Sequence, residues 1–270
     1  QFYQIADLRN GNPRTRVSSP HNRSRVVMTG IVLCAGLGTR LGSLTHEVPK
    51  PMLPVAGRPI LEYVLANLTR GGVQPLAINL HFRPDAIRER FREWPNLRFV
   101  HEPELLGTAG GAANLIRTLG LAGPLLVHYG DILTNQDLRP LMQFNADRSA
   151  DATLLIHRRP NSMSALAVDA DGRVTKFLER PGEHERSLVA DPWVFSGIAV
   201  CDASIFADVP STGATDLPRD VLIPLVERGR VYAMPLAGSR FAIDSPQRLA
   251  EAEAAVSTGS GWEFVCEGSP

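Results

Sequence analysis

The sequence has little lysine, little cysteine and no long apolar run, and each shortage excludes something. Lys50 and Lys176 are its two lysines, so arginine supplies almost all of the 28 basic residues. The three cysteines (Cys34, Cys201 and Cys266) lie far apart, which argues against a disulfide framework or a paired-cysteine metal site. No apolar run approaches the ~18 residues that a membrane span needs. Because 28 acidic residues balance the basic ones, we expect no nucleic-acid partner, no membrane association and a cytoplasmic location.

Three segments differ in composition. Residues 1–27 place arginines among Asn, Pro and Ser without an apolar period, which predicts a disordered N-terminal extension. Residues 28–256 carry the regular apolar pattern of a single folded domain, and a chain with 44% hydrophobic residues can bury a large core. Residues 257–270 are expected to form a C-terminal tail.

Strand-like and helix-like segments alternate along the first half of the domain. Apolar runs predict strands at 30–35, 76–80, 97–100 and 125–129. Amphipathic patterns predict helices at 59–69, 84–94 and 109–119. The second half adds strands at 152–157, 165–168, 174–178 and 194–200, and helices at 217–228 and 246–255. This alternation predicts an α/β fold with a doubly wound, mostly parallel mixed sheet of the Rossmann-like type.

A glycine-rich loop, L-C-A-G-L-G-T-R-L at 33–41, follows the first predicted strand. In an open α/β sheet, ligands bind beyond the carboxyl ends of the strands. Glycines at such a place let backbone N–H groups approach phosphate oxygens. The glycines at 36, 38 and 42 do not fit G-x-G-x-x-G, and the sequence has no Gly-Lys pair for a Walker loop. The loop therefore predicts a phosphate site of another kind.

Lys50 lies between two prolines, Pro49 and Pro51. Because proline fixes its own φ and biases the preceding residue towards extended conformations, we expect Lys50 to be held in an extended, non-helical segment. Attack on a phosphorus atom concentrates negative charge, and catalysis of phosphoryl transfer consists mainly of positioning and electrostatic stabilisation. A fixed ammonium near the glycine loop suits that chemistry.

The segments G-L-G-T-R-L at 36–41 and P-K-P at 49–51 together resemble the signature of the sugar-phosphate nucleotidyltransferase (NDP-sugar pyrophosphorylase) family. The resemblance covers about 30–256 and implies transfer of a nucleotidyl group from a nucleoside triphosphate to a sugar 1-phosphate, with release of pyrophosphate. It implies catalytic roles for Arg40, at the triphosphate and leaving pyrophosphate, and for Lys50, at the reacting phosphate. The nucleotide-binding residues that it implies are Leu33, Ala35, Gly36, Gly38, Thr39, Gly107, Thr108 and Gly111.

Other segments resemble further motifs of this family. Asp131 follows the strand predicted at 125–129, where the family places a carboxylate that binds Mg²⁺, the expected cofactor. The run F-L-E-R-P at 177–181 resembles F-x-E-K-P, so Glu179 would bind sugar hydroxyls and Arg180 would replace the lysine at the sugar phosphate. Gly197 resembles a small-residue contact to the sugar.

The sequence departs from the family near its end. The family motif W-x-D-I-G-T-P, aligned on Ser245-Pro246, places Ala242 where the second magnesium-binding aspartate stands. Asp244 would lie roughly 6–7 Å along the strand, too far to substitute directly. We expect Asp244 to be a metal ligand through water or a shifted register, with a turn residue as the alternative. This departure keeps open a non-catalytic, nucleotide-binding regulatory homologue.

The sequence favours a guanine nucleotide. L-G-T-A-G at 106–110 resembles the guanylyl branch of the family, which suggests GTP with mannose 1-phosphate or a related hexose or heptose phosphate. Against this, I-N-L-H-F at 78–82 is similar to uridylyltransferases that act on N-acetylmuramate 1-phosphate, and a phosphocholine cytidylyltransferase is a third alternative. The expected partners are these two substrates. A homo-oligomer stays open, and the pattern fixes neither the pathway nor a role for residues 1–27.

Overall fold

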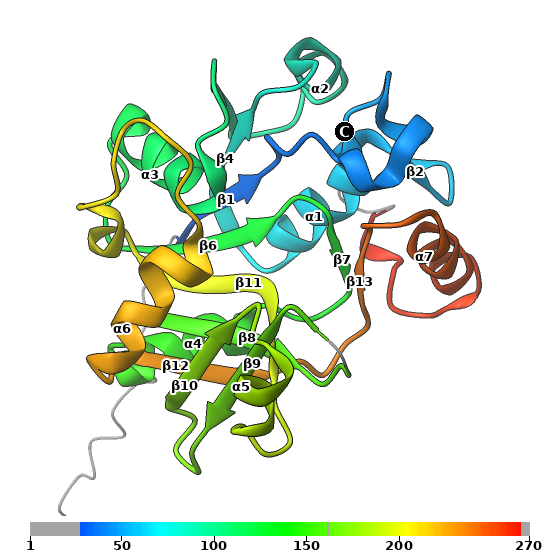
Figure 1. Cartoon of the computed structure of the whole chain (residues 1–270). Coiled ribbons are helices and arrows are strands. Elements are labelled where there is room, and N and C mark those ends of the chain that lie inside the picture. Colours follow the sequence, from blue (N-terminus) through cyan, green and yellow to red (C-terminus); the bar gives the residue numbers. More distant parts are fainter. Residues whose placement is uncertain (1–27, 161, 266–270) are drawn as a thin grey trace, which may run out of the picture.

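The computed structural model describes residues 28–160 and 162–265, so the extension predicted at 1–27 lies outside the described residues. A seven-stranded sheet runs through the molecule (Figure 1). Its strands, in spatial order, are β12 (Val231–Pro235), β8 (Ala152–His157), β11 (Val194–Asp202), β6 (Pro124–Tyr129), β1 (Met28–Leu33), β4 (Val73–Leu80) and β5 (Leu97–His101). Strands β6, β1, β4 and β5 are parallel, as are β12 and β8, and β11 runs antiparallel to both neighbours. The predicted mostly parallel mixed sheet is confirmed.

Helices cover both faces of the sheet. One hydrophobic cluster includes residues of α1 (Ile60–Arg70), α2 (Pro84–Arg90), α4 (Arg139–Arg148) and α7 (Pro246–Thr258). The opposite cluster includes residues of α3 (Gly107–Leu119), α6 (Ile223–Glu227) and the hairpin of β9 (Ser164–Val168) and β10 (Val174–Glu179). Successive residues of β1 divide between the two, with Val32 in the first cluster and Ile31 in the second. Since strand side chains alternate between faces, a doubly covered strand reads as a continuous apolar run.

The remaining elements are short. They are β2 (Pro54–Val55), β3 (Arg58–Pro59), β7 (Ile132–Thr134), β13 (Arg240–Ala242), α5 (Glu183–Ser187), 3₁₀ helices at Thr39–Thr45, Lys50–Met52 and Ala203–Phe206, and a π-helical segment at Leu217–Leu222 that precedes α6. The sequence pattern predicted none of β7, β12, β13 and α4. The helix predicted at 84–94 ends at Arg90.

The pairing of two short strands, β7 and β13, brings the segment around residue 243 beside the end of the central strand β6. They pair antiparallel, with Ala242 opposite Ile132 and Arg240 opposite Thr134. Just beyond the pair, Ile243 N donates a hydrogen bond to Asp131 O at 2.9 Å. The segment after β13 therefore lies against the residue that follows β6.

The described part of the predicted tail packs on the core. Helix α7 continues to Thr258, and Trp262, Phe264 and Val265 are buried in the cluster that contains α1. The Trp262 ring meets the Tyr63 ring edge-on, with centroids 6.0 Å apart. The boundary between domain and tail at residue 256 stays a prediction, but residues beyond it are buried in the same hydrophobic cluster. Among the described residues, no helix combines the length and apolar character that crossing a bilayer requires.

Candidate active site

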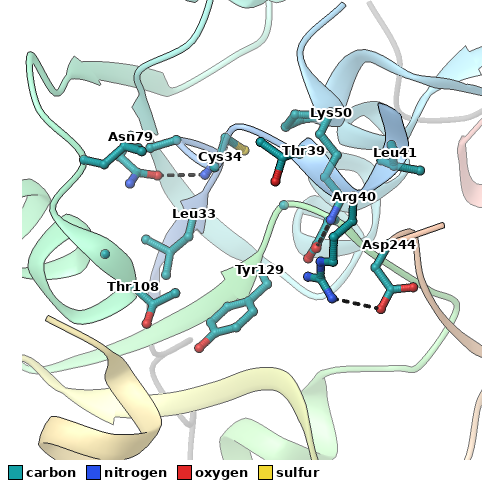
Figure 2. A pocket seen from close by; sticks show the side chains of 18 of the residues that line it. Leu33, Cys34, Thr39, Arg40, Leu41, Lys50, Asn79, Thr108, Tyr129 and Asp244 are labelled. Atoms are coloured by element: carbon teal, nitrogen blue, oxygen red, sulfur yellow. Dashed lines mark hydrogen bonds and ion pairs between the residues drawn. The ribbon is translucent and has the colours of Figure 1, made fainter. Parts of the chain in front are cut away.

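A pocket of about 460 Å³ opens where β1, β4 and β6 end (Figure 2). Leu33, Asn79 and Tyr129, from the ends of these three strands, form its floor. Most residues singled out from the sequence line this pocket: Leu33, Ala35, Gly36, Gly38, Thr39, Arg40, Lys50, Gly107, Thr108, Asp131 and Asp244. Figure 2 shows Arg40, Lys50 and Asp244 on one side of the pocket, Leu33 and Thr108 on the other, and Tyr129 between them. The pocket lies where the carboxyl ends of parallel strands predict a ligand.

The glycine loop forms a tight turn against Lys50. Gly38 has φ 69°, a left-handed conformation that favours glycine. A Cβ at this position would stand 3.1 Å from the Cβ of Lys50 and 3.1 Å from the Cγ2 of Thr45. The turn is held by Thr45 Oγ1, which donates to Gly38 O at 3.0 Å. Gly38 thus brings the loop and Lys50 to the same wall of the pocket.

Lys50 does not lie in an extended segment, and that prediction was wrong. It begins the 3₁₀ helix Lys50–Met52, with Pro51 as its second residue. Proline is tolerated there because the first residues of a helix have no intrahelical acceptor for an N–H. The Lys50 side chain is 10% exposed, and its Nζ donates to Oδ2 of Asp131. The ion pair orients a largely buried ammonium at the pocket wall.

Asp244 joins two arginines at the pocket edge. Its Oδ2 lies 3.6 Å from Arg40 Nη1, and its Oδ1 lies 3.3 Å from Arg248 Nε. The Arg40 side chain is 72% exposed, and Figure 2 shows it reaching toward Asp244. An ion pair with this N–O distance and this exposure contributes little to the stability of the fold. Arg40 can therefore leave Asp244 and bind an anion at a small cost in free energy.

Asp131 and Asp244 are the two carboxylates among the residues that line the pocket, and they do not by themselves form a metal site. Within 28–160 and 162–265, no group of three or more His, Cys, Asp or Glu side chains could hold a metal ion. Mg²⁺ at phosphate sites takes one or two carboxylates and completes its octahedron with phosphate oxygens and water. Asp131 and Asp244 both line the pocket, on segments joined by the Ile243–Asp131 hydrogen bond. Ala242, at the position of the expected second aspartate, is buried.

Gly111, expected among the nucleotide contacts, does not line the pocket. It lies in α3, where a Cβ would stand 2.5 Å from Asn79 Nδ2 and 2.9 Å from Glu102 Oε1. These two side chains are hydrogen-bonded to each other at 2.8 Å. The missing side chain of Gly111 thus lets α3 pack closely on the Asn79–Glu102 pair.

The three residues expected at the sugar phosphate lie next to the pocket rather than on its wall. Burial, followed by the charge of Asp216, raises the pKa of Glu179 to about 7. Arg180 extends into solvent, with 75% of its side chain exposed and its Nε 3.9 Å from Glu179. Gly197 has φ 86°, and a Cβ there would stand 3.1 Å from the ring of Tyr129, a pocket residue. Gly197 therefore packs against the pocket residue Tyr129, Glu179 lies close enough for its charge to act on Tyr129, and most of the Arg180 side chain is exposed to solvent.

Sequence reasoning missed Asn79 and Tyr129. Asn79 Oδ1 accepts a hydrogen bond from Cys34 N at 2.7 Å, and its Nδ2 donates to Glu102, so the amide joins the end of β4 to the start of the glycine loop. A polar residue inside the apolar run I-N-L was the available signal. Tyr129 carries no such signal, because an aromatic residue at the end of a buried strand is ordinary. Burial, followed by the charge of Asp131, raises the pKa of the Cys34 thiol far above its usual range, which favours the protonated thiol.

Gly107 and Thr108 are fixed by a segment distant in sequence. Gly107 has φ 75°, and a Cβ there would stand 2.5 Å from Thr215 O. The Thr108 hydroxyl accepts from Leu217 N at 2.7 Å and donates to Asp216 Oδ2 at 3.3 Å. The start of α3 is therefore closed against residues 215–217, which completes the wall of the pocket opposite the glycine loop.

Comparison with known proteins gives a family and a common fold. Residues 29–262 match the family described as "Nucleotidyl transferase". The chain is 30% identical over 205 residues to a mannose-1-phosphate guanylyltransferase of Mycobacterium tuberculosis, covering 74% of this chain and 55% of the relative. It is 29% identical over 215 residues to the bifunctional protein GlmU of Methanococcus maripaludis, covering 78% and 50%. The chain thus spans about half the length of these curated relatives.

Among solved structures, the fold is similar to that of HddC from Yersinia pseudotuberculosis complexed with GMP-PN. The TM-score is 0.68 at 23% identity, and the match covers 84% of this chain and 99% of that one.

Proposed function

Because this chain belongs to the nucleotidyl transferase family, we propose that it transfers a nucleotidyl group from a nucleoside triphosphate to a sugar 1-phosphate and releases pyrophosphate. The observation that carries the proposal is the meeting of the glycine loop, Arg40 and Lys50 in one pocket at the carboxyl ends of the parallel strands. This arrangement suits binding of a polyphosphate by backbone N–H groups and two cations.

We favour GTP as the donor and mannose 1-phosphate, or a related hexose or heptose phosphate, as the acceptor. The support is the resemblance of residues 106–110 to the guanylyl branch and the similarity to the M. tuberculosis guanylyltransferase. The triphosphate would lie along the loop residues Ala35, Gly36, Gly38 and Thr39. Its nucleoside would lie between Leu33 and the wall at Gly107 and Thr108. Gly111 would not touch the nucleoside; it would let α3 pack closely on Asn79, which lines the pocket.

In the proposed reaction, an oxygen of the sugar 1-phosphate attacks the α-phosphorus of the triphosphate. A new P–O bond forms as the bond to the bridging oxygen of pyrophosphate breaks. Lys50, held by Asp131, would stabilise the charge that develops at the α-phosphate, and its burial strengthens that field. Arg40 would leave its long contact with Asp244 and hold the departing pyrophosphate.

Mg²⁺ is the proposed cofactor, with Asp131 and Asp244 as its protein ligands. When bound, the ion would neutralise charge on the phosphate oxygens. Of the two carboxylates, Asp131 is also needed to position Lys50. Near the acceptor, Glu179 would bind sugar hydroxyls, and Gly197 would leave room beside the ring of Tyr129. The cytoplasmic location stays a prediction from composition.

Pyrophosphate release tests this proposal. The chain is incubated with Mg²⁺, each of GTP, UTP, CTP and dTTP, and each of mannose 1-phosphate, glucose 1-phosphate and N-acetylmuramate 1-phosphate. We expect the fastest release with GTP and mannose 1-phosphate, and almost none from the Lys50→Met variant. A preference for UTP with N-acetylmuramate 1-phosphate would overturn the choice of substrates. GTP binding without release under any combination would instead favour a non-catalytic homologue.

A further inference from the structure

Arg240 is a half-buried arginine that forms no ion pair among the described residues, although the charges of Asp131 and Asp244 act on it. It lies on β13, and its Nε donates to Ser196 O at 2.9 Å, which fixes the guanidinium beside Gly197. Across the described ranges, Arg240 makes no ion pair, and its two Nη groups have no protein acceptor. A guanidinium that is fixed through Nε and unpaired at both Nη groups has the fork geometry that binds two oxygens of one phosphate.

Other cations accompany Arg240. Burial is the main reason that its pKa falls to about 10; the charges of Asp131 and Asp244 oppose this fall, and the charges of Arg159 and Arg248 add to it. Arg159 is itself half-buried and forms no ion pair within the part of the chain that the structure describes. His157 stays neutral at pH 7, because burial and then the charges of Arg240 and Arg159 lower its pKa to about 4. Positive charges gathered in a partly dry region are costly unless an anion joins them.

The position of this cationic cluster relates it to the pocket. Asp131, on the pocket wall, is the group that most strongly supports the charged form of Arg240. Arg240 and Ala242 lie two residues apart on β13 and so share a face of the strand. This face thus carries a fixed positive charge and, at Ala242, a methyl group. Arg240 does not itself line the pocket, so an anion bound here would lie beside Ser196 and Gly197, next to the pocket.

We propose that Arg240, assisted by Arg159, binds the phosphate group of the sugar 1-phosphate acceptor. The inference rests on the proposed function, because it places the second substrate of that reaction. It differs from the role that the family resemblance gives to Arg180. The Arg180 side chain is 75% exposed, and a solvated cation attracts a phosphate less than a partly buried one does.

Two measurements test the inference: the KM for mannose 1-phosphate from pyrophosphate release, and the Kd for mannose 1-phosphate from calorimetry. Arg240→Gln removes the charge and should raise both constants about 10- to 100-fold, the cost of a lost charged hydrogen-bond pair. The KM for GTP should stay unchanged. Arg159→Gln should shift the constants in the same direction by less, and Arg240→Lys should restore part of the loss because it keeps a single donor charge.

The matched control is Arg230→Gln. Arg230 is also an arginine near a sheet strand, but it is 53% exposed and paired with Asp151 at 2.9 Å, so its removal should leave both constants unchanged. Thermal unfolding of each variant checks folding. If Arg240→Gln does not fold, Arg240→Lys, which loses the fork of donors, and Arg159→Gln, which removes the assisting charge, should each still raise both constants by a smaller factor.

The outcomes separate this inference from the proposed function. Absence of turnover by the wild-type chain with every substrate pair would refute the function, while calorimetry with mannose 1-phosphate and glucose 1-phosphate would still test Arg240. In an active enzyme, unchanged acceptor constants in Arg240→Gln would overturn the inference. So would a larger effect from Arg180→Gln than from Arg240→Gln.

Discussion

Replacing Glu179 with glutamine should remove a pH-dependent destabilisation of the fold. Burial, with the charge of Asp216 second, raises the pKa of Glu179 from 4.5 to about 7 in the folded protein. Between these two values the folded state holds a proton that the unfolded state has already released. The free energy of unfolding contributed by this group therefore falls as pH rises, and the loss is complete above the folded pKa.

The magnitude follows from the two pKa values. A tenfold change in proton affinity corresponds to about 1.4 kcal/mol, so the whole shift sets an upper limit of about 3 kcal/mol. Because 19% of the Glu179 side chain remains exposed, solvent screening lowers the expected effect to about 1–2 kcal/mol. The Glu179→Gln variant keeps the shape and the hydrogen-bonding groups but has no charge to bury.

Urea unfolding of both proteins between about pH 5 and about pH 8 measures the effect. The variant should match the wild type near the lower limit and exceed it by the expected amount near the upper limit. His128 and His157, whose pKa values burial lowers to about 4, also make stability depend on pH. They are present in both proteins, so the difference between the two curves isolates Glu179. The reasoning would be refuted if the difference in free energy of unfolding between the two proteins did not change with pH, or if the wild type became more stable relative to the variant as pH rises.

Four other predictions follow from the same contacts. Lys50→Met should lower kcat for pyrophosphate release by about 10²–10³-fold, and activity close to the wild type would exclude its proposed role. Gly107→Ala should destabilise the fold by at least about 1–3 kcal/mol, because it combines φ 75° with a Cβ 2.5 Å from Thr215 O; its urea midpoint measures this. Trp262→Ala should cost about 3–5 kcal/mol, since the ring is buried against Tyr63, and an unchanged midpoint would mean that this segment does not belong to the folded domain. Chelation with EDTA should abolish turnover and added Mg²⁺ should restore it, whereas full activity in EDTA would rule out the proposed cofactor.

Strong local patterns made parts of the fold predictable. The strand expected at 152–157 has the bounds of β8, because its apolar run is buried on both faces and has a polar residue before it. The sequence A-D-G after Asp169 is typical of a hairpin turn, and it forms the turn between β9 and β10, with Gly172 N donating to Asp169 O at 3.1 Å. Helix α4 was missed because only two of its residues are buried, so its apolar stripe is too weak to stand out. Strand β12, at one edge of the sheet, was also missed.

The sequence by itself determined the alternation of strands and helices, the glycine turn and the placement of Lys50 near it, since these depend on neighbours along the chain. It could not determine the conformation around Lys50, where two prolines are compatible with both an extended segment and the start of a 3₁₀ helix. Only the tertiary structure decided which distant groups meet. The Lys50–Asp131 contact joins residues 81 positions apart, and the β7–β13 pairing brings Arg240 close enough to Asp131 for their charges to interact. Such contacts depend on strand order and register, which composition and periodicity do not encode.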